Sequence, residues 1–161
     1  MLSYQHEYHA GNFADVHKHL VLWLVLDSLL ARPKPFVALD LFAGSGQYPL
    51  DRGAAARSGE WREGIGRLWS LDRGRDPLQA WLDQIRGMQP DPGRLTTYPG
   101  SPELIRRRLR EQDQLVACEL HPGAFAALQD ALRTDSRCHL HRRDAREASR
   151  ALFPPEPRRG L

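Results

Sequence analysis

The chain has 161 residues, of which 41% are hydrophobic, enough for one domain with an ordinary core. Its net charge is only +3, and the basic residues are almost all Arg, the better bidentate partner of phosphate, although a GC-rich genome also enriches Arg. Two cysteines without zinc-finger spacing argue against a disulfide framework or a metal site, and the longest apolar stretch is too short to span a membrane; we expect a soluble, cytoplasmic protein.

The amino-terminal part combines histidines with a predicted helix. Apolar side chains recur at three- and four-residue steps over residues 14–31, which predicts a largely buried helix. No two of the nearby histidines have the i, i+4 spacing of a helical metal site, and no carboxylate or thiol completes a set. A cluster of His and Lys here favours contact with adenine or phosphate, and an ordinary surface cluster is the alternative. The histidines are His6, His9, His17 and His19.

Residues 36–46, Phe-Val-Ala-Leu-Asp-Leu-Phe-Ala-Gly-Ser-Gly, predict a buried strand that runs into a tight turn. The strand ends at Asp40, where open α/β sheets bind their ligands, and Gly44 and Gly46 allow a close backbone approach. Such a turn occurs in NAD enzymes, in methyltransferases and in purely structural turns, so the motif alone does not choose between them.

A helical insertion subdomain is expected over about residues 48–94, where Gly and Pro interrupt the sequence repeatedly. Helical patches are predicted at 61–69 and 78–85. The many arginines of this segment could face phosphate, with Trp61 and Trp69 available for stacking. The alternative is a solvated face with both tryptophans packed inward.

After the insertion the sequence predicts regular elements again. Ser101 is expected to cap a helix over 102–110, with Pro at its first position. A strand over 115–120 includes Glu119, and Asp144 follows a third strand. The order strand, helix, strand, helix, strand, helix predicts part of a Rossmann-like, doubly wound parallel sheet. The remaining elements are predicted at 122–133, 138–141 and 146–153.

Three acids, Asp40, Glu119 and Asp144, fall at or just beyond the carboxyl ends of successive predicted strands. Because these ends share one edge of a parallel sheet, we expect the acids to line one rim, where carboxylates accept hydrogen bonds from ribose hydroxyls and exocyclic amines. Residues 158–161 lead toward a fourth strand, so we expect all 161 residues to be the amino-terminal part of one longer domain.

Several longer blocks resemble one family, the RlmJ-type adenine-N6 methyltransferases of large-subunit ribosomal RNA. The blocks are Met1-Leu-Ser-Tyr-Gln-His6, His9-Ala-Gly-Asn12, Ala14-Asp-Val16 with Lys18-His19, Leu39-Asp40 with Ala43-Gly-x-Gly46, Tyr98-Pro-Gly-Ser-Pro102, Arg110-Glu-Gln-Asp113, Glu119-Leu-His-Pro122 and Arg158-Arg-Gly-Leu161.

The resemblance implies a soluble enzyme that uses S-adenosylmethionine on large-subunit ribosomal RNA, either protein-free or partly assembled. It implies that Glu119 binds the cofactor ribose and Asp144 the adenine amine. Tyr4, His6 and Lys18 would face the RNA and the target adenine. The full set of cofactor residues implied in this way is His19, Asp40, Phe42, Gly44, Gly46, Ser101, Glu119, Asp144 and Ala145.

Two departures from the family qualify this expectation. The family often has His where this chain has Phe42, so only packing or backbone contact is expected there. The family's catalytic Asp-Pro-Pro-Tyr follows the Arg-Arg-Gly-Leu block and lies beyond Leu161, so we expect no catalytic residue and no turnover in these residues alone. The alternatives are a DNA-directed family member acting in the use of external DNA, and a nucleic-acid-binding module without chemistry. An NAD oxidoreductase is disfavoured because no third Gly follows Gly46 at the usual interval.

Overall fold

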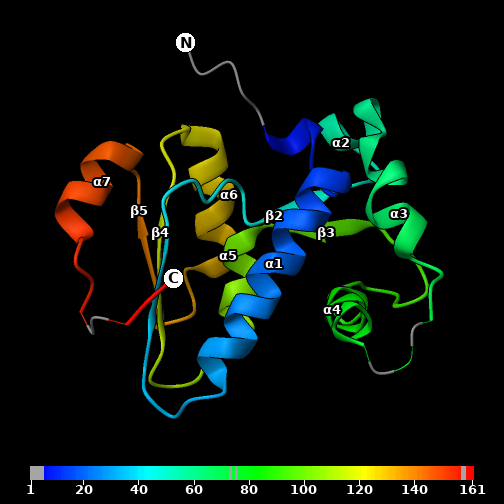
Figure 1. The fold of residues 1–161 in the computed structure, drawn as a ribbon. Helices are drawn as coiled ribbons and strands as arrows, with labels where there is room; N and C mark the ends of the chain where they lie inside the picture. Colours follow the sequence, from blue (N-terminus) through cyan, green and yellow to red (C-terminus); the bar gives the residue numbers. More distant parts are fainter. Residues whose placement is uncertain (1–5, 73, 75, 157–158) are drawn as a thin grey trace. The chain divides into compact units, whose positions relative to one another are not determined.

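The computed structural model describes residues 6–72, 74, 76–156 and 159–161, which form two compact units (Figure 1). The first unit comprises Met1–Leu24 and Tyr48–Pro99, and the second comprises Val25–Gln47 and Gly100–Leu161. Tyr4 lies outside the described residues. Within the described part of the chain, we find no helix with the length and apolar character needed to cross a membrane.

The first unit is mainly helical and surrounds its own apolar core. Trp81, Tyr98 and Ile65 are fully buried at its centre. Trp61 and Trp69 pack against this core, which agrees with the inward alternative for the two tryptophans. Its elements are η1 (His6–Tyr8), the first part of α1 (Phe13–Leu30), β2 (Gln47–Pro49) paired with β3 (Thr97–Pro99), α2 (Gly53–Ser58), η2 (Glu60–Glu63), α3 (Ile65–Leu68) and α4 (Pro77–Arg86).

The predicted helical patch over 61–69 is wrong in one respect, because it is not continuous. Gly64 separates η2 from α3, and a Cβ atom at this position would lie 2.1 Å from the carbonyl oxygen of Gly11. The backbone of Gly11 therefore approaches too closely for any other residue at position 64. The patch predicted over 78–85 lies inside α4, whose first turn is capped by the Asp76 carboxylate.

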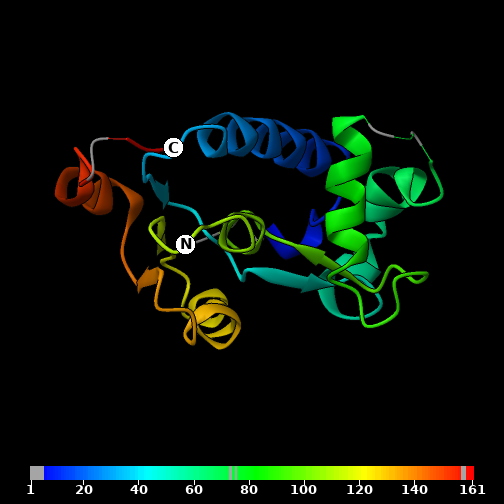
Figure 2. The same cartoon turned by 90° about the horizontal axis from the view of Figure 1, so that it is seen from below.

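The second unit contains a three-stranded parallel sheet in the order β1-β4-β5. Asp40 is level with Ala117, and Cys118 is level with His141, so the three strands end at one edge. Figures 1 and 2 show α7 on the opposite side of this sheet from α5 and α6. The elements are β1 (Val37–Asp40), α5 (Ser101–Arg106), β4 (Gln114–Cys118), α6 (Pro122–Leu132), β5 (Cys138–His141) and α7 (Ala145–Leu152).

Residues 159–161 continue the sheet on the other side of β1. The Val37 amide donates to the Arg159 carbonyl, and the Leu39 amide donates to the Leu161 carbonyl, in a parallel arrangement. The sheet thus grows from β1 outward to β5, and the chain then returns to the free edge of β1. This reversal confirms the partial Rossmann-like prediction and makes the carboxyl end of β1 a topological switch point, where such sheets bind ligands.

Candidate functional site

Asp40, the last residue of β1, organises the turn that follows it. Its Oδ1 atom accepts a hydrogen bond from the Phe42 amide at 3.2 Å, and its Oδ2 atom accepts one from the Ser101 hydroxyl at 2.5 Å. The expectation that Ser101 caps the next helix is therefore wrong. Gly100 is the N-cap residue and Ser101 is the first residue of α5, which ends at Arg106 rather than at 110.

The glycine turn is tied to the end of β4 through Glu119. Gly44 and Gly46 have φ angles of 63° and 76°, which side chains with a Cβ atom rarely adopt. The Gly44 amide donates to Oε2 of Glu119 at 2.9 Å, and the His121 amide donates to Oε1 at 2.7 Å. Because the Gly46 carbonyl also accepts from the Gly100 amide at 2.8 Å, three segments converge at this edge.

Asp144 is the third acid of the rim and follows β5 by three residues. Its carboxylate caps α7 by accepting from the Arg146 amide at 2.8 Å, and Ala145 is the first residue of that helix. The structure thus places Asp40, Glu119 and Asp144 at the same edge of the sheet. We call these three acids with the turn from 40 to 46 the acidic rim.

The acidic rim offers hydrogen-bond acceptors at the edge of the sheet. Asp40, Glu119 and Asp144 are partly exposed, and an ionised carboxylate accepts about four hydrogen bonds. The two bonds to Glu119 and the one to Asp144 therefore leave acceptor capacity for hydroxyls and amines. Phe42 is 81% exposed and offers an aromatic face beside the turn.

A second polar cluster lies in the first unit around Asp15, a residue to which the sequence interpretation gave no role. Its side chain is completely buried, and its Oδ2 atom accepts from the Gly11 amide at 3.0 Å and lies 3.3 Å from Nε2 of His6. Its Oδ1 atom lies 3.1 Å from Nζ of Lys18 and 3.7 Å from Nε2 of His19. One carboxylate therefore holds three of the residues that the resemblance singled out.

Asp15 is ionised and His19 is neutral at neutral pH, because the pKa values of both groups are lowered. Burial favours a raised pKa for Asp15, but the hydrogen bond from His6 and the histidine charges outweigh it, so the pKa falls well below its usual value. Burial lowers the pKa of His19 to about 4, against the opposing charge of Asp15. In neutral His19, Nδ1 accepts from the Tyr98 hydroxyl at 2.9 Å when the proton is on Nε2, and Nε2 lies 3.7 Å from Oδ1 of Asp15, beyond hydrogen-bond distance.

The Asp15 cluster also bears on the expectation that no carboxylate or thiol completes a metal-binding set with the histidines. Lys18 and His19 follow Asp15 at the i+3 and i+4 positions of α1, and this spacing was readable from the sequence. The ammonium group of Lys18 already pairs with the Asp15 carboxylate, so a metal ion would have to compete with it. Among the residues that the structure describes, no group of three or more His, Cys, Asp or Glu side chains is arranged to hold a metal ion.

Seven acids nearly balance the eight arginines of the insertion at residues 48–94. The first unit has equal numbers of basic and acidic residues, so the whole net charge of +3 belongs to the second unit. Arg57 lies over the Tyr8 ring and Arg62 over the Trp61 ring, and Arg86 pairs with Asp83. These contacts weaken the phosphate-facing interpretation of this segment.

The parallel sheet, the glycine turn and the acids at the switch point define a partial Rossmann-like α/β fold. The model of the family described as RsmJ, ribosomal RNA large subunit methyltransferase D, RlmJ, matches residues 33–161, and the chain belongs to this family.

Known relatives agree with this assignment. The chain is 44% identical over 161 residues to ribosomal RNA large subunit methyltransferase J of Escherichia coli (strain K12), and 37% identical over the same length to the protein of that name from Haemophilus influenzae. All of this chain is covered in both comparisons, but it spans only 57% of each relative.

A solved structure supports the fold independently. The crystal structure of a Legionella pneumophila protein, assigned to the family DUF519, superposes with a TM-score of 0.83 at 33% sequence identity. The match covers 94% of this chain and 55% of the other.

Proposed function

We propose that the complete protein transfers a methyl group from S-adenosylmethionine to N6 of an adenine in large-subunit ribosomal RNA. The observation that carries the proposal is the acidic rim, in which Glu119 and Asp40 each hold part of the glycine turn at the switch point of the sheet. Membership of the RlmJ family and the names of two relatives support methylation of large-subunit ribosomal RNA.

In this proposal the rim binds and orients the cofactor, whose sulfonium supplies an electrophilic methyl group. Glu119 accepts hydrogen bonds from the ribose hydroxyls, and Asp144, with the neighbouring Ala145 backbone, contacts the adenine. Asp40 and Ser101 hold the turn so that the backbone at Gly44 and Gly46 faces the ligand. Phe42 contributes packing without a side-chain hydrogen bond. The proposal retains His19 in the cofactor set, and Tyr4, His6 and Lys18 toward the RNA.

The chemistry requires one further group near the rim. Adenine N6 is a poor nucleophile because its lone pair is delocalised into the ring, so the amine must be oriented by acceptors. The family's Asp-Pro-Pro-Tyr follows the Arg-Arg-Gly-Leu block. Residues 159–161 run parallel to β1 and reach the level of Leu39, which supports placing that motif beside Asp40 in the complete protein.

Calorimetry of the complete protein with S-adenosylhomocysteine and with NAD tests the cofactor. We expect binding of S-adenosylhomocysteine alone, and Glu119→Ala weakens it by about 1 to 3 kcal/mol because a charged acceptor is lost. Glu111→Ala is the matched control, since Glu111 is an exposed acid before β4, at the opposite edge of the sheet. Binding of NAD alone would overturn the proposal, and equal affinities of the two variants would remove Glu119 from the site.

The reaction itself is tested with large-subunit ribosomal RNA purified from cells that lack the gene. After incubation with the complete protein and labelled S-adenosylmethionine, nucleoside mass spectrometry should detect N6-methyladenosine. A methylated nucleoside other than this one would contradict the proposed site on the base. An absence of label, with cofactor binding intact, would contradict the proposed substrate.

A further inference from the structure

We propose that Arg142, Arg143, Arg146 and Arg150 form a surface that binds the phosphates of the substrate RNA. We call these four residues the β5–α7 arginine surface. The proposal rests on the proposed function for the identity of the polyanion as RNA. It goes beyond that function because it assigns substrate binding to residues outside the cofactor set and outside Tyr4, His6 and Lys18.

The four arginines lie after β5 and on α7. Arg142 and Arg143 directly follow β5 at the edge of the sheet that carries the acidic rim. Burial raises the pKa of the Cys118 thiol at the end of β4, and the nearby charge of Arg143 opposes that rise. The charge of Arg143 therefore reaches the end of the neighbouring strand. The surface begins at the rim where the cofactor is proposed to bind.

The outer face of α7 carries two of the four arginines. Ala148 is fully buried, whereas Arg146 and Arg150 are exposed one helical turn apart. At 1.5 Å per residue, their Cα atoms are separated by roughly 6 Å along the helix axis. Glu147 lies between them and offsets part of their charge. Asp144 faces the first turn of the helix as its N-cap.

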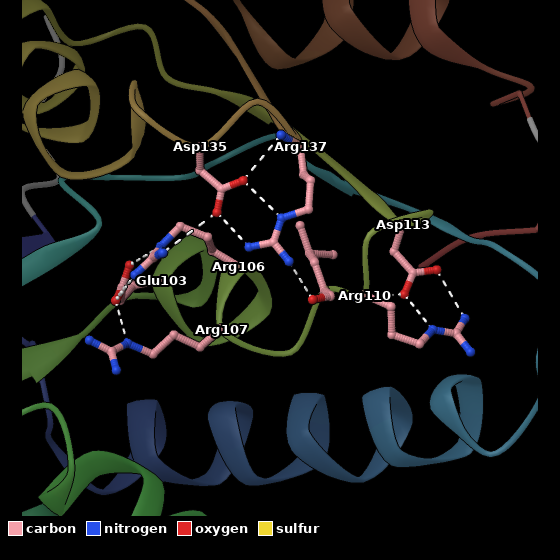
Figure 3. A network of polar contacts seen from close by, with 8 residues as sticks. Glu103, Arg106, Arg107, Arg110, Asp113, Asp135 and Arg137 are labelled. Carbon is pink, nitrogen blue, oxygen red and sulfur yellow. Dashed lines mark hydrogen bonds and ion pairs between the residues drawn. The ribbon is translucent and has the colours of Figure 1, made fainter.

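Several other arginines of the second unit form ion pairs with acids. In Figure 3, Arg106 and Arg137 contact the Asp135 carboxylate, and Arg110 contacts Asp113. Arg107 pairs with Glu103 in the same view. These guanidinium groups are neutralised within the protein, although the run at 106–110 is the most basic stretch of the sequence. A run of basic residues in the sequence is therefore not enough to locate the anion-binding surface.

The β5–α7 arginine surface differs because no contact in the described part of the chain pairs its four side chains with a carboxylate. The second unit carries the whole net charge of +3, and this stretch has four arginines against two acids. Four unpaired guanidinium groups spread over a loop and a helix fit a chain of phosphates, which Arg binds bidentately.

The test compares two double variants of the complete protein. Arg142→Ala with Arg143→Ala removes two charges beside the rim. Arg32→Ala with Arg133→Ala removes two exposed charges from segments before β1 and before β5, at the opposite edge of the sheet. The probe is a fluorescently labelled transcript of large-subunit ribosomal RNA, and its affinity is measured by anisotropy over a series of salt concentrations.

We expect the rim-side variant to bind the transcript about tenfold more weakly at low salt, with the slope of log affinity against log salt reduced by roughly 1 to 2. The opposite-edge variant should match the wild type. Arg142→Lys with Arg143→Lys keeps both charges and should retain most of the slope. Equal affinities and slopes for the two alanine variants would overturn the proposal.

Calorimetry with S-adenosylhomocysteine separates this proposal from the proposed function. The rim-side variant should bind S-adenosylhomocysteine as the wild type does, which also verifies its fold. Loss of that binding together with RNA binding would assign the arginines to the cofactor and overturn the phosphate surface. If the wild type methylates RNA and the variants bind it equally, only this inference fails. If the surface is needed for RNA binding but no cofactor binds, only the proposed function fails.

Discussion

Oδ2 of Asp15 lies 3.3 Å from Nε2 of His6, and the carboxylate has no exposed surface. This contact joins the short helix η1 to α1, because Asp15 belongs to α1 and also accepts from the Gly11 amide between them. The amino-terminal segment is therefore held by a buried charge rather than by apolar packing alone. His6 and Lys18, proposed to face the RNA, depend on one carboxylate for their placement.

The first prediction follows from this dependence. Asp15→Asn keeps the size of the side chain but loses the charge that pairs with His6 and Lys18, so we expect the free energy of unfolding to fall by about 1 to 3 kcal/mol. Hydrogen exchange at the amides of η1 should accelerate. Glu63→Gln is the control, because the Glu63–Arg67 pair is largely exposed and contributes little. Equal effects of the two changes would show that Asp15 does not fasten the segment.

The second prediction concerns the loss of folding stability at low pH. The pKa of His19 in the folded protein is about 4, below its ordinary value of 6.5, because burial disfavours the charged ring. The unfolded chain therefore binds a proton that the folded chain does not, and the contribution of His19 is complete above pH 6.5 and declines as the pH falls toward 4. The loss approaches about 3 kcal/mol.

Two measurements check the behaviour of His19. Nitrogen NMR of the imidazole should show a neutral ring at pH 5.5, and the stability of His19→Gln should depend less on pH between 6.5 and 4 than that of the wild type. A ring that becomes charged near pH 6.5 would contradict the assignment of a buried, neutral histidine bonded to Tyr98.

The acidic rim was predictable from the sequence because it depends on strand order. Apolar runs locate the strands, parallel pairing aligns their carboxyl ends, and the acids follow at those ends. The role of Ser101 was not predictable in this way. Its Ser-Pro-Glu pattern is typical of a helix start, but the Ser101 hydroxyl donates its hydrogen bond to Asp40, which is distant in sequence. Local patterns contain no information about such a partner.

The pairing of the arginines in the insertion could not be read from the sequence for a different reason. These arginines are conspicuous in the sequence, but acids such as Glu63 and Asp83 accompany them and pair with them. The sequence interpretation considered carboxylates beside the histidines only as metal ligands, and it gave Asp15 no other role. Its i+4 relation to His19 was available, but complete burial of that carboxylate follows from the fold and not from the spacing.

The third prediction distinguishes two positive-φ glycines. Gly46→Ala places a Cβ atom 3.2 Å from Cδ1 of Leu128 in addition to the backbone strain, whereas Gly53→Ala has the same kind of φ angle with no atom within 4 Å. Left-handed strain alone costs roughly 1 to 2 kcal/mol. We therefore expect both variants to melt at lower temperature, and Gly46→Ala to lose more.

Cofactor affinity separates these two glycine variants further. Only Gly46→Ala should also weaken binding of S-adenosylhomocysteine, because Gly46 belongs to the turn that is tied to Gly100 and lies beside Glu119. Unchanged affinity in Gly46→Ala, measured by calorimetry at a temperature where the variant is folded, would indicate that the turn does not approach the ligand.

The fourth prediction concerns the polar network of Figure 3. Arg137 donates to both oxygens of Asp135, at 2.8 and 2.6 Å, and to the carbonyl of Leu109 at 2.5 Å. Lys cannot reproduce this planar arrangement, so Arg137→Lys should lower the free energy of unfolding by about 1 to 3 kcal/mol although the charge is kept. Arg52→Lys is the control, because Arg52 is largely exposed in its contact with Asp51.

Low pH should break the ion pair between Arg137 and Asp135 once the Asp135 carboxylate is protonated. The hydrogen bond from Arg137 lowers the pKa of Asp135 to about 2 from its ordinary 3.8. A depressed carboxylate stabilises the fold above pH 3.8 and loses that contribution as the pH falls toward 2, so the difference between Arg137→Lys and the wild type should persist at pH 4 and shrink below it. Denaturant titrations at a series of pH values measure that difference. A difference that vanishes already at pH 5 would show that Asp135 is not the partner that makes Arg137 matter.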